Sequence, residues 1–245
     1  MTLLKICGLR QPPQARAVAE LGVDAIGVIA VPGSPRHLEA SLRPALFEAV
    51  RAVRPDCLRV LVVADPTEAD LPTLGPGRGH DRIQLHGQES PQRCAELRKR
   101  LGLPLWKALR VRHPAELQAC AAWLGVVDAL LLDAWVPGQL GGTGHPIPPE
   151  WLVDFAPPLP WWLAGGVTPE RAPTLLDQFR PTGLDASSGV EDSPGEKNLA
   201  RVAALVQAVR QADGAAPGGA APDGVAAGGS GGGGLGQREA RIGIL

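Results

Sequence analysis

The chain has 245 residues, of which 44% are hydrophobic and 20% are charged, and its formal net charge at pH 7 is −1. A near-neutral chain with no cluster of Lys or Arg among aromatic residues lacks the electrostatic footprint of a nucleic-acid-binding protein. Its apolar runs are short and end at charged residues, and its N-terminus lacks the basic start and apolar stretch of a signal peptide. We therefore expect neither a membrane span nor a secreted protein.

Eight short apolar segments have the length and composition of β-strands. They span residues 3–6, 25–29, 58–63, 82–85, 105–109, 129–132, 161–164 and 183–186. Most of the intervals between them, and the stretch after the last, carry apolar residues at helical spacing. These helical segments span residues 14–21, 42–53, 92–101, 115–123, 169–179 and 199–212. Strands that alternate with helices predict a parallel sheet with right-handed crossovers.

Eight such units predict an α/β fold, a closed (β/α)8 TIM barrel that forms a single catalytic domain over residues 1–212. The structural alternative is a doubly wound open sheet. It is disfavoured because no strand leads into a GxGxxG turn and because the glycine-rich turns follow the last strands rather than the first. After Gln211 the composition changes to Gly, Ala and Pro, which predicts a low-complexity, flexible tail over residues 213–245.

Two glycine-rich turns follow the last two predicted strands. Gly165 and Gly166 belong to the first, and Ser187, Ser188 and Gly189 belong to the second. Neighbouring turns that expose backbone N–H groups form a cradle for a phosphate dianion. In a barrel of eight β/α units, the loops after strands seven and eight are a frequent place for such a group. The two turns therefore predict a phosphate site.

The first predicted strand carries two groups that can do chemistry. Lys5 and Cys7 share a face, which we expect to look into the barrel. The Lys5 ammonium is expected to lower the pKa of the Cys7 thiol and so make it a competent base or nucleophile. Asp185 ends the eighth strand, which neighbours the first, and is the expected partner of Lys5. The alternatives are a small apolar filler at Cys7 and a purely structural Lys5–Asp185 pair.

A carboxylate directly follows the leucines of the sixth strand. Asp133 is expected at the rim of the barrel, facing Cys7 across the mouth, where it can act as a general acid. The alternative is a helix or loop cap without a catalytic duty. Gln84 and His86 share a face at the end of the fourth strand, and we expect His86 to be an orienting hydrogen-bond donor rather than the base.

Two loops complete the predicted mouth. Arg36 follows a rigid Ser-Pro step, and its planar fork suits the bidentate capture of a carboxylate, whereas the alternative is an ordinary surface arginine. The glycine-rich loop around Gly142 can fold over a ligand. The six tryptophans show no spacing typical of a stacking platform, so we expect most of them to pack between helices and strands.

The four cysteines lie far apart in the sequence and form no CxxC pair. This usage favours a reducing, cytoplasmic compartment and argues against a zinc site.

As a set, these residues resemble the phosphoribosylanthranilate isomerase family. The resemblance is co-linear over about residues 3–211. The motifs that carry it are Lys5-Ile6-Cys7-Gly8, Ser34-Pro35-Arg36, Gln84-Leu85-His86-Gly87, Leu131-Leu132-Asp133, Gly141-Gly142-Thr143-Gly144, Ala164-Gly165-Gly166, Asp185 with Ser187-Ser188-Gly189-Val190-Glu191, and Ser193-Pro194-Gly195-Glu196-Lys197.

The resemblance implies an Amadori rearrangement in tryptophan biosynthesis, without metal or organic cofactor. N-(5-phosphoribosyl)anthranilate becomes 1-(2-carboxyphenylamino)-1-deoxyribulose 5-phosphate. It further implies that Asp133 protonates the ribose ring oxygen, that Cys7 removes the proton from sugar C2, and that Arg36 holds the anthranilate carboxylate. The phosphate would rest on the two glycine-rich turns, and Asp185 would contact the sugar hydroxyls or tune Lys5 and Cys7.

Two other functions remain open at this point. One is a related phosphosugar barrel, such as an aminoaldose-phosphate isomerase, an epimerase or an indole-forming synthase, although only His86 stands where an epimerase needs several metal-binding histidines. The other is a non-catalytic phosphate-binding barrel, which would need neither Cys7 nor Asp133. In each case the expected partner is a small phosphosugar, with no nucleic acid or membrane, and the sequence leaves open whether the barrel is a monomer or a homodimer.

Overall fold

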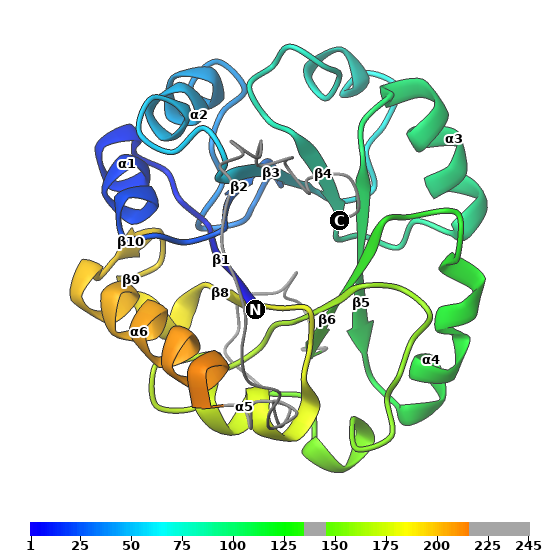
Figure 1. Ribbon diagram of the computed structural model, residues 1–245. Coiled ribbons are helices and arrows are strands. Elements are labelled where there is room, and N and C mark those ends of the chain that lie inside the picture. Colours follow the sequence, from blue (N-terminus) through cyan, green and yellow to red (C-terminus); the bar gives the residue numbers. More distant parts are fainter. Residues whose placement is uncertain (135–145, 216–245) are drawn as a thin grey trace, which may run out of the picture.

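The computed structural model of the chain describes residues 1–134 and 146–215. Within them eight parallel strands close into a barrel, in which each strand pairs with the next and β8 pairs with β1 (Figure 1). The strands are β1 (Leu3–Cys7), β2 (Ala25–Ile29), β3 (Leu58–Val63), β4 (Arg82–Leu85), β5 (Leu105–Val111), β6 (Ala129–Ala134), β7 (Trp161–Leu163) and β8 (Gly183–Ala186). The predicted TIM barrel is confirmed, and β2, β3, β4 and β8 have the predicted bounds.

The helices form a ring around the barrel (Figure 1). They are α1 (Pro12–Glu20), α2 (Arg43–Arg51), α3 (Pro91–Leu101), α4 (Pro114–Gln118), α5 (Ala172–Phe179) and α6 (Leu199–Ala215). The single helix predicted over residues 115–123 is divided into α4 and the 3-10 helix η2 (Ala119–Trp123). Between β3 and β4 the chain forms only the 3-10 turn η1 (Leu71–Thr73), because prolines and glycines interrupt helical hydrogen bonding there.

Local sequence signals set the helix ends. Helix α3 begins after Ser90, whose side chain accepts a hydrogen bond from the Arg93 amide at 3.2 Å, and Pro91 occupies its first turn. It ends at Gly102, which adopts the left-handed conformation that closes many helices. Such caps fix where each helix starts relative to its strand, and therefore where the loops at the barrel mouth lie.

Strand alternation separates two apolar layers. Side chains such as Ile6, Leu130 and Leu132 belong to the large core between the strands and the helices. A smaller cluster fills the barrel itself and contains Ala25, Val60, Trp106, Ala108, Ala129, Leu131, Trp162 and Ala164. Successive strand residues point to opposite faces, so residues two positions from these interior side chains also face inward.

Two tryptophans fill the amino-terminal end of the barrel. Trp106 and Trp162 lie near the starts of β5 and β7, and their ring centroids are 4.8 Å apart with an interplanar angle of 32°. A Cβ atom at Gly183 would come within 2.5 Å of the Trp162 ring, so only glycine fits there. This pair lies inside the barrel, whereas Trp123 and Trp161 belong to the core between strands and helices, where most of the tryptophans were expected.

A short antiparallel hairpin follows the barrel and was not predicted. Its strands are β9 (Glu191–Ser193) and β10 (Glu196–Lys197), which come after the 3-10 turn η4 (Ser188–Val190). The hairpin lies between α1 and α6 (Figure 1), and side chains of both helices bond to its backbone. In the described part of the chain no helix is long and apolar enough to cross a membrane.

Candidate active site

The polar interior residues gather at the carboxyl end of the barrel. Cys7 is the last residue of β1, and Asp133 is the last but one of β6. Leu131 belongs to the interior cluster, so Asp133, two residues further on, faces inward as well. Cys7 is 6% exposed and Asp133 is 3% exposed. The predicted base and acid thus both line the interior of the barrel on separate strands.

The closing seam between β1 and β8 holds the predicted ion pair. Lys5 and Asp185 are register partners, and the Lys5 Nζ donates a hydrogen bond to an Asp185 carboxylate oxygen at 2.9 Å. Burial alone would lower the pKa of Lys5, but the charges of Asp185 and Cys7 outweigh it and raise that pKa. Burial raises the pKa of Asp185, although Lys5 opposes this. The pair predicted from barrel closure is present.

The environment of Cys7 differs from the expectation. Burial raises the pKa of its thiol, and the lowering effects of the Lys5 and Lys197 ammonium groups only partly offset that increase. Lys5 lowers the pKa of Cys7 as the sequence predicted, but the larger effect of burial, which was not anticipated, gives a net rise. Gly27 on β2 leaves room for the thiol, because a Cβ atom there would lie 2.7 Å from the Cys7 Sγ.

Three polar side chains follow one another on the far side of the mouth. The Gln84 Nε2 lies 3.0 Å from the His86 Nδ1, and the His86 Nε2 lies 3.4 Å from an Asp133 carboxylate oxygen. All three side chains are buried. His86 therefore lies between Gln84 and Asp133, and its Nε2 makes no hydrogen bond within the described residues. Its predicted role as an orienting donor stays a prediction.

Arg36 is buried and has a partner that the sequence did not reveal. Its Nε lies 2.9 Å and its Nη2 lies 2.6 Å from the two carboxylate oxygens of Glu191 on β9. This pair occupies the guanidinium edge formed by Nε and Nη2. The edge formed by Nη1 and Nη2 can still donate hydrogen bonds to another group. The reading of Arg36 as an ordinary surface arginine is wrong, because the residue is only 7% exposed.

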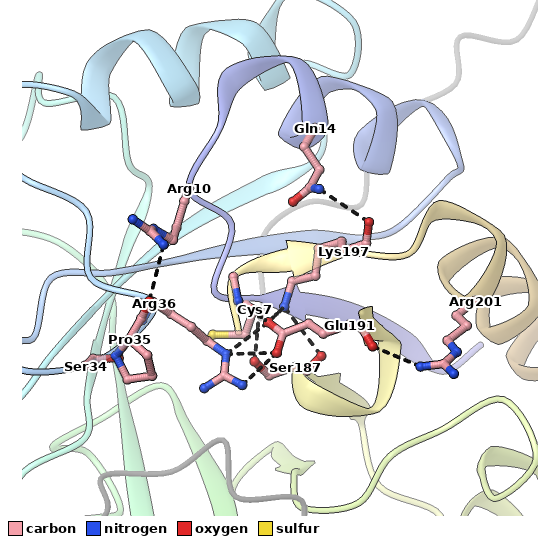
Figure 2. A network of polar contacts seen from close by, with 11 residues as sticks. Cys7, Arg10, Gln14, Ser34, Pro35, Arg36, Ser187, Glu191, Lys197 and Arg201 are labelled. Atoms are coloured by element: carbon pink, nitrogen blue, oxygen red, sulfur yellow. Dashed lines mark hydrogen bonds and ion pairs between the residues drawn. The ribbon is translucent and has the colours of Figure 1, made fainter. Parts of the chain in front are cut away.

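Glu191 also binds a second cation. The Lys197 Nζ lies 2.5 Å from the Glu191 Oε1, and the amide of Gly195 donates to the same oxygen at 3.1 Å (Figure 2). Burial would raise the pKa of Glu191, but hydrogen bonds from Arg36 and Lys197 outweigh it and lower that pKa. The Pro194-Gly195 turn between Glu191 and Lys197 is the sequence signal that could have placed these two side chains together.

The two glycine-rich turns pack against each other. Gly165 and Gly166 both have positive φ, and their N–H groups donate to no other group within the described residues. A Cβ atom at Gly189 would collide with the Val167 carbonyl oxygen, so the second turn lies directly on the first. The Ser187 hydroxyl donates to the Cys7 carbonyl oxygen at 3.1 Å and ties this turn to β1. Gly165, Gly166, Ser187, Ser188 and Gly189 are all partly exposed.

A second buried lysine–glutamate pair lies on the opposite side of the barrel, on β5 and the loop after β4. The Lys107 Nζ donates to Glu89 at 2.7 Å and to the Gly87 carbonyl oxygen at 2.8 Å. Glu89 in turn accepts a hydrogen bond from the Asp65 amide at 2.7 Å. The pair was not predicted, because Lys107 stands in the sequence as a single charged residue within an apolar strand.

The remaining predictions concern Gly142 and the absence of a metal site. Gly142 lies in residues 135–145, outside the described residues. Among residues 1–134 and 146–215, no group of three or more His, Cys, Asp or Glu side chains could hold a metal ion.

Comparison with known proteins identifies close relatives over the whole barrel. Residues 4–208 match the family model of N-(5'phosphoribosyl)anthranilate (PRA) isomerase. The chain is 47% identical over 204 residues to the N-(5'-phosphoribosyl)anthranilate isomerase of Thermosynechococcus vestitus, which covers 83% of this chain and 87% of that protein. It is 42% identical to that of Rippkaea orientalis, over 85% of this chain and 96% of that protein.

A solved structure agrees with these relatives. The crystal structure of phosphoribosyl anthranilate isomerase from Thermus thermophilus superposes with a TM-score of 0.73 at 31% identity. The match covers 86% of this chain and 99% of that chain.

Proposed function

The chain belongs to the N-(5'-phosphoribosyl)anthranilate isomerase family, and we infer that Asp133 and Cys7 carry out the family's reaction as general acid and general base. The protein is an aldose–ketose isomerase of tryptophan biosynthesis. Its substrate is N-(5-phosphoribosyl)anthranilate and its product is 1-(2-carboxyphenylamino)-1-deoxyribulose 5-phosphate.

The first step opens the sugar ring. Asp133 gives its proton to the ring oxygen as the C1–O bond breaks, and the lone pair of the anthranilate nitrogen forms the C1=N bond of a Schiff base. His86, 3.4 Å from the carboxylate, keeps Asp133 aimed into the barrel. The carboxylate that remains is balanced by the positive charge on the nitrogen.

The second step moves a proton from carbon. The Cys7 thiolate removes the proton at C2, and the electrons of that C–H bond form C1=C2 while the C=N electrons return to nitrogen. The enolamine then tautomerises, so that C1 gains a proton and the C2 hydroxyl loses one to give the ketone. Because Cys7 must be deprotonated and burial raises its pKa, kcat/KM is expected to rise with pH through the titration of this thiol.

The anionic ends of the substrate have separate sites. The phosphate rests on the turn of Gly165 and Gly166 and on the turn of Ser188 and Gly189, with Ser187 beside them. The anthranilate carboxylate binds the edge of Arg36 that Glu191 leaves open. Asp185 contacts the sugar hydroxyls or maintains Lys5 beside Cys7.

The observation that carries this proposal is the order of the strands around the barrel. The strands run β6, β7, β8 and β1, so the two phosphate turns lie between the strand of the acid and the strand of the base. A phosphosugar anchored on these turns has Asp133 to one side and Cys7 to the other.

The test is the fluorescence decay of freshly prepared phosphoribosylanthranilate on addition of the purified protein. Cys7→Ser and Asp133→Asn are each expected to lower turnover by at least about a hundredfold, the scale of general acid–base catalysis. Circular dichroism checks that each variant folds. Near-normal turnover by either folded variant contradicts its assignment.

The compartment follows from the same reading. All four cysteines are free and buried. Free thiols suit a reducing compartment, and we place the enzyme in the cytoplasm.

A further inference from the structure

The β9–β10 hairpin brings a buried lysine to the end of β1. Lys197 is the last residue of the hairpin, and its side chain is completely buried. Besides Glu191, its Nζ reaches the carbonyl oxygen of Ser187 at 3.4 Å. The Ser187 hydroxyl in turn donates to the Cys7 carbonyl oxygen, so Ser187 links Lys197 to the backbone of Cys7 at the end of β1 (Figure 2).

The hairpin is anchored from both neighbouring helices. The Gln14 side chain on α1 donates to the Lys197 carbonyl oxygen at 3.3 Å, and the Arg201 Nη1 on α6 donates to the Glu191 carbonyl oxygen at 2.9 Å. These bonds hold the backbone on both sides of the Glu191–Lys197 pair, so the position of the ammonium group is set by the fold and not by a mobile surface chain.

The cluster around Glu191 carries more positive than negative charge. Glu191 is shared by Arg36 and Lys197, and all three side chains are at most 8% exposed. A buried ion costs several kcal/mol of desolvation unless an opposite charge offsets it. One carboxylate cannot neutralise two cations, and the Lys5–Asp185 pair beside it is already balanced. The site therefore favours an additional negative charge.

Cys7 is a group that can supply that charge. The Lys197 ammonium lowers the pKa of the Cys7 thiol. Burial lowers the pKa of Lys197 itself, and Glu191 and the Cys7 thiolate oppose that decrease. The other charged groups that face them are Lys5 on β1, Asp185 on β8, and Arg36 and Glu191. Burial still raises the Cys7 pKa overall, so each nearby cation matters for how much thiolate forms.

We propose that Lys197 stabilises the thiolate of Cys7 through its buried ammonium group, and that it is thereby a positioning residue for the base. The inference rests on the proposed role of Cys7 in catalysis. Glu191 then has two duties: it keeps the Lys197 ammonium beside β1, and it fixes the Arg36 guanidinium that faces the substrate. A single carboxylate thus links the binding of the substrate to the state of the base.

The test measures the thiol of the complete, substrate-free protein. The rate of Cys7 alkylation by iodoacetamide is followed against pH, with the Cys7→Ser variant as background for the other three cysteines. Lys197→Met is expected to raise the pKa of Cys7 by about one unit, which is a tenfold loss of thiolate below that pKa. The same variant is expected to lose kcat by a similar factor while KM changes little. Lys197→Arg keeps the charge and is expected to restore most of the reactivity.

A matched control is available within the chain. Lys107 is also buried and bonded to a glutamate, but it acts on Cys94 rather than on Cys7. Lys107→Met is expected to leave the Cys7 titration where it is. If Lys197→Met does not fold, Lys197→Gln keeps a donor for Glu191 without the charge and carries the same test.

Each outcome decides one claim. An unchanged Cys7 titration in folded Lys197→Met or Lys197→Gln, or an equal shift in Lys107→Met, overturns the role of Lys197. The alkylation assay needs no substrate, so this result is independent of the turnover test. Normal turnover by Cys7→Ser refutes the proposed base instead, and leaves the effect of Lys197 on the thiol standing.

Discussion

Two buried lysine–glutamate pairs lie on opposite sides of the barrel and have different surroundings. Lys107 and Glu89 bond mainly to backbone groups of the loops after β3 and β4. Lys197 and Glu191 instead interact with Arg36 and Cys7, the residues proposed to bind the anthranilate carboxylate and to act as the base. Burial and a short ion-pair distance are common to both pairs, so they do not distinguish the pair proposed to act in catalysis. The pairs differ in the other groups that the lysine and the glutamate contact.

The largest effect on stability is expected from breaking the Lys107–Glu89 pair, which bonds mainly to backbone groups. Glu89→Gln leaves the Lys107 ammonium buried with one carboxylate fewer, and the loss of one partner of such a pair costs about 3–5 kcal/mol of unfolding free energy. Urea denaturation measures this loss. The folded variant is expected to keep kcat/KM within about tenfold of the parent, because neither residue faces the substrate.

The double variant Lys107→Met/Glu89→Gln sharpens this prediction. Removing both charges is expected to recover a large part of the lost stability. A double variant no more stable than Glu89→Gln would mean that the pair acts through something other than its charges.

On the functional side, Arg36→Ala is expected to act mainly on binding. Loss of one charge-assisted contact to the anthranilate carboxylate is expected to raise KM by about tenfold or more, with a smaller change in kcat. The control is Arg59→Ala, another arginine paired with a carboxylate, Asp81, at the amino-terminal side of β3. A loss confined to kcat, or an equal rise in KM for Arg59→Ala, would contradict the carboxylate site at Arg36.

Acid is expected to weaken the functional pair in a defined direction. The folded-state pKa of Glu191 lies below its ordinary value of 4.5. Its charge therefore contributes stability that is fully present above that value and is lost as pH falls through the folded pKa. The difference in unfolding free energy between the parent and Glu191→Gln should shrink over this range in urea titrations. A difference that stays constant from pH 6 to about pH 3 would exclude a contribution from the Glu191 charge.

The smallest effect is expected from removing the residues that follow α6. The tail predicted over residues 213–245 begins too early, because α6 extends to Ala215 and Asp213 accepts hydrogen bonds from Thr2. We propose that residues 216–245 do not contribute to catalysis. A chain cut after Ala215 is expected to keep its kcat/KM within about twofold, since α6 and the hairpin remain intact. A large loss of activity would place a functional contact in the removed segment.

The barrel was predictable because its signal is local and repeated. Apolar runs of strand length gave the bounds of β2, β3, β4 and β8, and barrel closure alone placed Asp185 against Lys5. Which side of a strand faces inward was harder to read. Both faces of these parallel strands are apolar, so the sequence does not show which side faces inward. The sequence therefore did not single out Trp106 and Trp162 as the tryptophans inside the barrel.

The cation cluster was beyond sequence reasoning for a different reason. Arg36 and Glu191 are separated by 155 positions and meet only because the hairpin folds back beside β1. The net pKa change of Cys7 was missed for a similar cause, because it is a balance between burial and several charges that only the packed structure defines. A motif can name the candidate residues, but it does not give the net effect of burial and neighbouring charges on their pKa values.

The contact between the tilted indole rings of Trp106 and Trp162 has a consequence for how substrate enters and product leaves. With the other interior side chains they fill the amino-terminal part of the barrel, so reactant and product are expected to pass through the same opening at the carboxyl end. A product molecule bound there prevents the next substrate molecule from binding, so the product is expected to inhibit the enzyme competitively with respect to the aminosugar substrate.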